Sequence, residues 1–291
     1  MPQATKPRGC ALTSVAIVGA GRLGSAIARA LREAGLVVEG PLGRGAAPAG
    51  DVVLLCVPDG EIATAAAALG RQPSAGARRV GHVSGATPLA ALAAAGGHAF
   101  GLHPLQTFTG GEGAEAFAGA GAAVAGKTPE ALAAAHGLAE ALGMTAIEVS
   151  DSERAAYHAA ASVASNFLVT LQSVAERLAG AAGIAPADAR SLLAPLVRRT
   201  VDNWAQHGPE AALTGPVARG DRATVARQRA AVDRHAPELL DLFDELVAAT
   251  VALAPSAPGG ASPPIPSPTG QAPAGGPGGA SPPIPSPEVA A

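Results

Sequence analysis

One histidine of this chain stands where a proton donor or acceptor is expected. His103 lies in the segment GLHPLQTF, residues 101–108, directly after a predicted strand, and Pro104 restricts the conformations open to it. An imidazole has an ordinary pKa of about 6.5, so it can exchange protons near neutral pH. Gln106, with its polar amide, could then contact a substrate. We predict proton transfer by His103; the alternative is a loop histidine without a chemical role.

A second polar group lies on a predicted helix, in the segment YHAAASVASN. His158, Ser162, Ser165 and Asn166 are spaced i, i+4, i+7 and i+8, which places them on one helix face among alanines. Such a stripe is typical of a cleft wall. We therefore predict catalytic roles for His158 and Asn166 and a substrate contact for Ser162. The alternative is hydrogen bonding between helices in a core of small residues.

A third segment, ALTGPVARGD at residues 212–221, contains two turns between predicted helices. These turns could present Thr214 and Arg219 to a substrate carboxylate, because a guanidinium forms strong hydrogen bonds with carboxylates. Asp221 is a good N-cap for the helix that follows. The cap is the simpler interpretation of this segment.

The elements that position these residues begin with a glycine-rich turn. A β-branched run at residues 15–18 leads into G-x-G-x-x-G, and small and apolar residues follow at helical spacing. This strand–turn–helix context predicts a dinucleotide site, in which the first helix presents its N–H groups to phosphates. The alternative is a turn without a ligand. The residues expected at the site are Gly19, Gly21, Arg22, Leu23 and Gly24.

The end of the second strand indicates which dinucleotide binds. Sites for NAD usually place a carboxylate about 20 residues after the glycines, to hold the ribose 2′-hydroxyl. In this chain Gly43 and Arg44 occupy those positions, and Glu39 comes too early, inside the strand or at its end. A glycine followed by a cation suits a 2′-phosphate. We therefore predict NADP as the cofactor; the alternative is that Arg44 is a solvated loop charge.

Strands and helices alternate through the first half of the chain, which predicts an α/β Rossmann domain over residues 13–150 with a doubly wound, mostly parallel sheet. Because ligands gather at the carboxyl ends of the strands, we expect Val57, Pro58 and Ser84 to border the cofactor. After the second strand, the expected strands are 51–58, 79–84, 98–102, 122–125 and 145–149, and the expected helices are 59–69, 88–95 and 129–142.

The second half, residues 151–253, contains no strand pattern and predicts an all-α domain. Its helices are expected at 151–182, with Asp151 or Ser152 as N-cap, at 186–207, and at 221–253, where Pro237 should kink or divide the helix. Residues 1–12 are expected to be a flexible end.

The carboxyl-terminal segment 254–291 is rich in Pro, Gly, Ser and Ala. Its sequence PGGASPPIPSP occurs twice, at 258–268 and 277–287. This composition predicts a disordered tail with polyproline II character. The tail either has no role or docks to a partner.

Composition excludes several classes of protein. The net charge of −3, without a basic stripe, argues against a nucleic-acid partner, and no apolar run is long enough to span a membrane. No signal peptide or metal-ligand spacing is present. The two cysteines, Cys10 and Cys56, do not suggest a disulfide framework, which fits a cytoplasmic location. We expect a small-molecule substrate.

Taken in order, GAGRLGSA, GLHPLQTF, YHAAASVASN and ALTGPVARGD resemble bacterial Rossmann-like proteins that carry the domain of unknown function DUF2520. The resemblance covers roughly residues 14–253. It implies an NADP-binding sheet domain joined to a helical domain, and a homodimer formed through the helical domain.

More distantly, the chain is similar to the β-hydroxyacid dehydrogenase group, whose helical domain is of the 6-phosphogluconate dehydrogenase C-terminal type, and to ketopantoate reductases, pyrroline-5-carboxylate reductases and prephenate dehydrogenases. In prephenate dehydrogenases a His-Pro pair contacts the substrate hydroxyl, and His103-Pro104 matches it. Hydroxyacid dehydrogenases and ketopantoate reductases use Lys-x-x-x-Asn. Asn166 matches the Asn, but Ser162 stands in place of the Lys, which shifts the proton role to a histidine.

These patterns lead to three hypotheses. The preferred one is an NADP(H)-dependent oxidoreductase that acts on a small carboxylated carbonyl or hydroxy compound, such as ketopantoate. His103 or His158 would exchange the proton, and Asn166 would hold the oxygen on which charge develops. The second is a prephenate- or arogenate-type dehydrogenase. The third is a non-catalytic NADP-binding sensor or scaffold whose proline-rich tail docks to a partner.

Overall fold

The computed structural model describes residues 12, 14–50, 52–71 and 78–254. The predictions for Cys10, for Asp51, for residues 1–11 and for the tail beyond residue 254 lie outside the described residues. The chain divides into two compact units, Met1–Gly180 and Ala181–Ala291, each of which is treated separately below.

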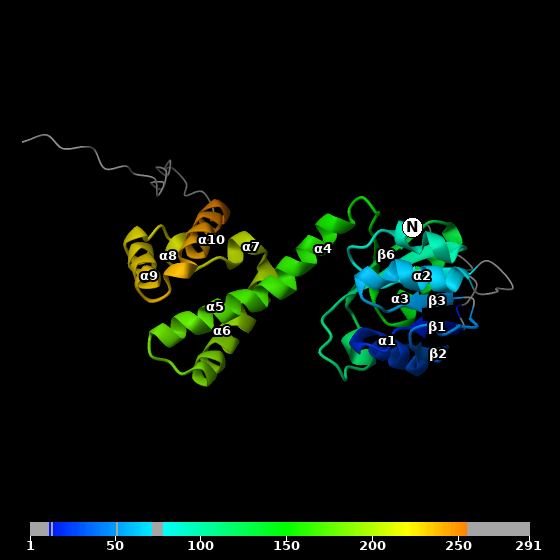
Figure 1. Cartoon of the computed structure of the whole chain (residues 1–291). Helices are drawn as coiled ribbons and strands as arrows, with labels where there is room; N and C mark the ends of the chain where they lie inside the picture. Colours follow the sequence, from blue (N-terminus) through cyan, green and yellow to red (C-terminus); the bar gives the residue numbers. More distant parts are fainter. Residues whose placement is uncertain (1–11, 13, 51, 72–77, 255–291) are drawn as a thin grey trace, which may run out of the picture. The chain divides into compact units, whose positions relative to one another are not determined.

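The first unit is built on a seven-stranded sheet with the strand order β2-β1-β3-β4-β5-β6-β7 (Figure 1). All neighbouring strands are parallel except β5 and β6. This arrangement confirms the predicted doubly wound, mostly parallel α/β fold. The strands are β1 Ser14–Val18, β2 Val37–Leu42, β3 Val52–Leu55, β4 Arg79–His82, β5 His98–Leu105, β6 Gly121–Gly126 and β7 Thr145–Glu148.

Helices cover both faces of this sheet. Helices α1 (Arg22–Glu33) and α3 (Pro129–Ala141) pack on one face, and α2 (Ile62–Gly70) packs on the other together with the 3₁₀ segment η2 (Leu89–Ala95). Successive residues of β1 and β3 belong alternately to the two cores, because side chains alternate along a strand. This double burial explains the continuous apolar runs of these strands. The short 3₁₀ segments η1 (Asp59–Glu61) and η3 (Ala114–Ala116) complete this part.

The glycine-rich turn brings β1, α1 and β3 close together. Gly19 has φ +117°, and a Cβ atom there would lie 2.1 Å from the Cys56 carbonyl oxygen. A Cβ atom on Gly24 would lie 2.1 Å from the Gly19 oxygen and 3.0 Å from Cys56 Cβ. At Gly21, in contrast, no atom lies within 4 Å of the Cβ position. Gly19 and Gly24 are therefore needed for packing, whereas Gly21 leaves open space.

Several predicted elements of the sheet domain differ from the structure. The predicted strand 51–58 ends at Leu55, and the predicted helix 59–69 begins as the 3₁₀ segment η1. The predicted helix 88–95 is a 3₁₀ segment. Strand β5 runs to Leu105 rather than Leu102, so His103 lies inside a strand and not in a loop after it. The reason is the antiparallel partner β6, which pairs with β5 from Phe100 to Leu105 and extends it.

The predicted helix 151–182 is interrupted in the structure. It consists of α4 (Arg154–Ser162), the π-helical segment η4 (Val163–Phe167) and α5 (Leu168–Ala181). The predicted N-cap at Asp151 or Ser152 is wrong, because α4 begins only at Arg154 and has no side-chain cap. The Asp151 carboxylate instead accepts hydrogen bonds from the Leu89 N–H and the Arg154 side chain.

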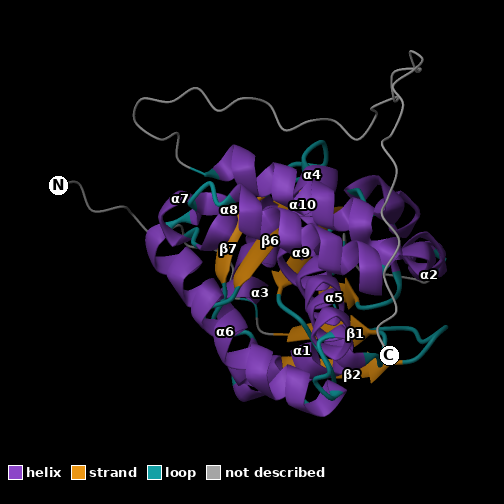
Figure 2. Cartoon of the chain, turned by 90° about the vertical axis from the view of Figure 1, so that its left-hand side faces the viewer, coloured by secondary structure: helices purple, strands orange, loops and turns teal. Residues whose placement is uncertain are grey.

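The described part of the second unit is helical, and all strands (orange in Figure 2) belong to the first unit. Asp221 caps α9 through the Thr224 N–H, as predicted, and Pro237 separates α9 from α10. Among the described residues, no helix could cross a membrane. The elements are α6 Pro186–His207, α7 Pro209–Ala212, α8 Gly215–Ala218, α9 Arg222–His235, η5 Pro237–Leu239 and α10 Leu240–Leu253.

The turn geometry predicts losses of stability of different size for two alanine substitutions. Gly24→Ala should lower the free energy of unfolding by about 1–3 kcal/mol, since the added methyl group meets backbone that cannot move away. Gly21→Ala, which points into open space, should cost less than about 1 kcal/mol. Urea denaturation followed by circular dichroism measures both. Equal losses for the two variants would contradict this assignment.

Candidate functional site

The loops after β3 and β4 are joined by the side chain of Ser84. Its hydroxyl donates to Asp59 Oδ2 at 2.7 Å and lies 2.9 Å from the Thr87 hydroxyl. It also accepts from the backbone N–H groups of Ala86 and Thr87, at 3.2 and 2.9 Å. Ser84 was predicted to border the cofactor. Its hydroxyl is engaged within the chain and fixes the shape of the loop after β4. The cofactor contacts of Ser84, Val57 and Pro58 stay predictions.

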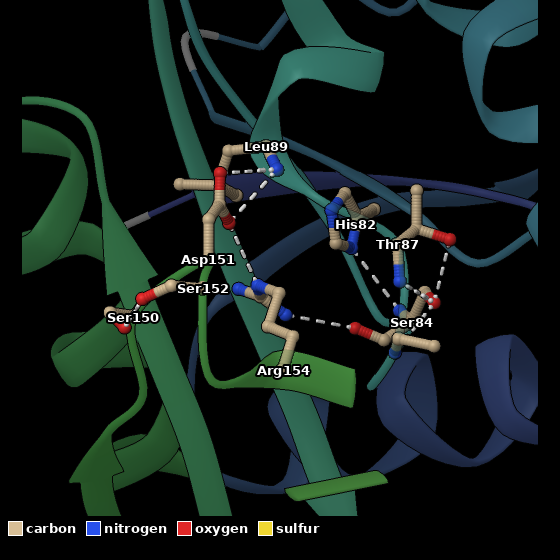
Figure 3. A network of polar contacts seen from close by, with 9 residues as sticks. His82, Ser84, Thr87, Leu89, Ser150, Asp151, Ser152 and Arg154 are labelled. Carbon is tan, nitrogen blue, oxygen red and sulfur yellow. Dashed lines mark hydrogen bonds and ion pairs between the residues drawn. The ribbon is translucent and has the colours of Figure 1, made fainter. Parts of the chain in front are cut away.

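His82, the last residue of β4, is buried beneath this edge (Figure 3). Its Nδ1 accepts a hydrogen bond from the Ser84 N–H at 3.2 Å, which fixes the neutral ring with its proton on Nε2. Burial lowers the pKa of His82 to about 4, and the nearby Arg154 cation adds to this effect. His82 is therefore neutral at physiological pH.

A buried ion pair lies next to His82. Arg154 is 1% exposed, its Nε donates to Asp151 Oδ1 at 2.9 Å, and its Nη1 donates to the Ser84 carbonyl oxygen at 3.2 Å (Figure 3). Asp151 also accepts from the Leu89 N–H, at 3.0 and 3.1 Å from its two oxygens. The pair thus connects the start of α4 to the loop after β4 and to η2. The sequence analysis missed this pair; the Asp-x-x-Arg spacing was the available signal.

His103 and His158 were both predicted as catalytic residues, and the structure brings them together. Their ring centroids lie 5.8 Å apart, edge to face. His103 Nδ1 lies 2.9 Å from the hydroxyl of Tyr157, which the sequence analysis did not single out. Helical position was the missed signal, since Tyr157 precedes His158 and shares its side of α4. We call these three residues the histidine–tyrosine cluster.

Burial sets the protonation of the histidine–tyrosine cluster. It lowers the pKa of His103 to about 4, with further contributions from His158 and the Arg154 cation. It also raises the pKa of the Tyr157 hydroxyl above its ordinary value. At neutral pH the cluster therefore holds an uncharged imidazole hydrogen-bonded to a protonated phenol. A proton can pass between these two groups.

Gly85 places the cluster at the carboxyl edge of the sheet. A Cβ atom on Gly85 would lie 2.6 Å from His158 Cδ2 and 2.9 Å from His103 Cε1. Both rings therefore rest directly on the backbone that follows β4 and Ser84. This edge of a doubly wound sheet is where such folds bind ligands.

Two other predicted residues of the stripe lie in or next to the π-helical segment. Ser162 ends α4 and Asn166 lies within η4, where the wider turn changes the spacing assumed for one helix face. The Ser165 hydroxyl bonds to the Ala161 carbonyl and to the Asn166 side chain. The catalytic role of Asn166 and the substrate contact of Ser162 stay predictions.

The remaining predicted substrate contacts are also untested. The Gln106 side chain donates to the Ala116 carbonyl and accepts from the Thr107 N–H. Thr214 and Arg219 belong to the second unit, where they flank the short helix α8. Within the described ranges, no group of three or more His, Cys, Asp or Glu residues could hold a metal ion.

The predicted nucleotide site lies at the start of α1. Its N-cap residue is Gly21, and no side chain caps the helix, so Arg22, Leu23 and Gly24 begin an uncapped N-terminus. Beyond β2, the exposed Arg44 side chain lies 3.3 Å from Glu61. Glu39 lies within β2, as expected, and accepts a hydrogen bond from the Ala49 N–H at 2.9 Å. The glycine turn and Arg44 thus offer backbone donors and a cation.

Comparison with known proteins supports this description. Residues 121–250 match the family model described as Domain of unknown function (DUF2520), which confirms the predicted resemblance for that part of the chain. The matched range contains the YHAAASVASN and ALTGPVARGD segments. No curated protein matches the sequence.

Solved structures share the fold. A candidate NADP oxidoreductase of Bacteroides fragilis has a TM-score of 0.69 at 18% identity, and a Thermotoga maritima protein whose name states no activity has 0.67 at 24%. Each match covers 82% of this chain and 98% of the other. A Plasmodium falciparum pyrroline carboxylate reductase with NADP bound has 0.52 at 9%, over 85% of this chain and 100% of that one. These similarities show a common fold.

The two neutral histidines predict a loss of stability in acid. His82 and His103 have pKa values of about 4 when folded and about 6.5 when unfolded, so between these values the unfolded chain binds more protons. Their contribution is complete above about pH 6.5 and is lost as the pH falls to about 4. For the fully buried His82 this amounts to the order of 3 kcal/mol.

Urea denaturation at about pH 7 and about pH 4.5 checks this linkage. His82→Asn, which removes the titrating ring, should show a smaller difference in the free energy of unfolding between the two pH values than the wild type. Gln206→Asn, an exposed substitution that removes no titrating group, should show the wild-type difference. The same acid-induced loss in His82→Asn as in the wild type would contradict the linkage.

Proposed function

We propose that this protein is an NADP(H)-dependent oxidoreductase that transfers a hydride to or from a small carbonyl or hydroxy compound. The observation that carries the proposal is the histidine–tyrosine cluster at the carboxyl edge of a Rossmann sheet. The glycine turn that follows β1, where Gly21 leaves open space, lies at the same edge of the sheet. The solved structures of similar fold, one of them with NADP bound, add support.

The residues at the start of α1 fit a dinucleotide. The open space at Gly21 would accept a pyrophosphate, and the uncapped N-terminus of α1 would donate N–H groups to it. Arg44, exposed beside Glu61, would bind the 2′-phosphate. Glu39, within β2, already accepts a hydrogen bond from the Ala49 N–H, which agrees with the choice of Arg44 over a carboxylate as the group that reads the ribose.

When bound, NADPH supplies the hydride. The chain must supply the proton that converts the developing alkoxide into an alcohol, or remove it in the reverse direction. Tyr157 is protonated and in contact with His103, so the phenol can donate its proton to the substrate oxygen. The phenolate would regain a proton from His103 Nδ1 while the imidazole takes up a replacement proton from water at Nε2. His158 packs against the same imidazole and helps to exclude water. The amide of Asn166 is proposed to hold the substrate oxygen.

The substrate class is proposed from two sources. The match of Asn166 to the Asn of ketopantoate reductases favours a ketopantoate-like oxo acid as the substrate that is reduced. In the reverse reaction, the corresponding hydroxy acid would be the CH–OH donor. The fold similarity to pyrroline carboxylate reductases adds a cyclic imine to the compounds worth testing. The His103-Pro104 pair keeps prephenate or arogenate as the alternative substrate. The homodimer, the cytoplasmic location and the docking role of the tail stay predictions.

The cofactor assignment predicts different effects for two variants. Arg44→Ala should weaken NADPH binding by about 10–100-fold, the value of a charge-assisted hydrogen bond, and leave NADH binding unchanged. Gly21→Ala should weaken both, because its methyl group enters the phosphate space. Arg71→Ala, an exposed arginine beyond α2, is the matched control. Isothermal titration calorimetry measures the dissociation constants; unchanged discrimination between the coenzymes in Arg44→Ala would rule out this role.

The chemistry predicts a rate effect at the cluster. Tyr157→Phe and His103→Asn should each lower kcat by about 10²–10⁴-fold and leave the NADPH dissociation constant within about twofold, since they remove proton transfer and not cofactor contacts. The rate is followed by the absorbance of the reduced nicotinamide, with ketopantoate, prephenate and 1-pyrroline-5-carboxylate as substrates. His207→Asn is the control. Full activity in both cluster variants would refute the proton role.

A further inference from the structure

The buried guanidinium of Arg154 suggests how the histidine–tyrosine cluster is assembled. We propose that Arg154 is a positioning residue, which fixes α4 on β5 and thereby holds Tyr157 and His158 against His103. This positioning role rests on the proposed function only in that the proposed function makes the cluster catalytic. The contact network that supports it is a property of the first unit alone.

The first step of the argument is the spacing along α4. Tyr157 and His158 follow Arg154 by three and four residues, so all three side chains lie on the same side of the helix. Between Arg154 and these residues the helix rises by about 4.5–6 Å. A helix fixed at Arg154 therefore has its next turn fixed as well.

The second step is the matching spacing along β5. Gly101 and His103 are two residues apart, so they face the same side of the sheet, at a separation of about 6.6 Å. A Cβ atom on Gly101 would lie 2.3 Å from Arg154 Nη2. Arg154 thus lies over Gly101, and Tyr157, about one helical turn further along α4, contacts His103, two residues further along β5.

The third step is that Arg154 is held from several directions. Asp151 and the Ser84 carbonyl bind two of its nitrogens, and Asp151 is itself bound to the Leu89 N–H of η2. Arg154 is 1% exposed, and its Nη2 has no hydrogen-bond partner among the described residues. A buried, forked cation fits this place where a lysine could not bind both acceptors in the same geometry.

The charges around His103 allow the proposal to be tested by titration. His158, Tyr157 and Arg154 face it from α4, His82 from β4, and Asp59 from η1. Release of α4 would admit water to the imidazole and reverse the desolvation that lowers its pKa. The pKa of His103 therefore reports whether the helix is still held on the strand.

The experiment is an NMR titration of His103 in the full chain, with its resonance assigned from His103→Asn. Arg154→Lys keeps a cation but loses the fork, and Gly101→Ala keeps Arg154 but occupies the space of its Nη2. In both variants the pKa of His103 should rise from about 4 by roughly one unit or more. Arg154→Met should raise it further, since it also removes the charge. Arg198→Met, in α6, should titrate like the wild type.

A wild-type pKa for His103 in folded Arg154→Lys and Gly101→Ala would overturn the proposal. An equal shift in the Arg198→Met control would overturn it too. Because the proposal confines the effect to the start of α4, loss of the whole fold in Arg154→Lys, seen by circular dichroism, would also contradict it. The titration needs neither coenzyme nor substrate. A chain without coenzyme affinity would therefore refute the proposed function and leave this result standing.

Discussion

The structure depends on close contacts at glycine positions, where a side chain would collide with a neighbouring segment. At Gly19 and Gly24 the backbone of β1 and α1 meets Cys56, at Gly85 two imidazole rings rest on the chain, and at Gly101 a guanidinium does so. A Cβ atom at any of these four positions would lie within 3.0 Å of another atom. The first two approaches form the proposed nucleotide turn, the third supports the cluster, and the fourth places Arg154 beside it. Both halves of the proposed site therefore use the same device.

The sequence allowed much of the fold to be predicted, because the signals were local. The apolar runs before Gly19 and Pro58, and the alternation of strands and helices, correctly indicated a mostly parallel sheet. Asp221 and Pro237 correctly marked helix ends. These features depend on neighbours in the sequence, so single-sequence reasoning can find them.

Features that depend on distant partners were not predictable in this way. Strand β5 is longer than expected because β6 pairs with it. Asp151 does not cap α4 but binds the Arg154 side chain and the Leu89 N–H, because Leu89 lies beside it. The π-helical segment leaves no mark in the residue pattern. In the site, His103 and His158 were identified by residue type and spacing, whereas the roles of Tyr157 and Arg154 depend on contacts with His103 and the Ser84 carbonyl, which are distant in the sequence.

The proposed mechanism combines the neutral His103 ring and the protonated Tyr157 phenol with a nearby buried cation. The neutral ring of His103 and the protonated phenol of Tyr157 can move a proton without creating an isolated buried charge, which would be costly in this environment. Arg154 supplies positive charge close to the cluster while its own position is fixed by Asp151. His103 and Tyr157 are thus both positioned and kept in one protonation state before any ligand arrives.

The central claim is that NADP bound at the glycine turn extends along the sheet edge to the cluster. Histidine NMR spectra recorded during addition of NADP⁺ to the full chain test it most directly. We predict saturable shifts of the His103 and His158 resonances, with the exposed His207 unchanged. Saturating NADP⁺ that leaves His103 and His158 unmoved would contradict the account.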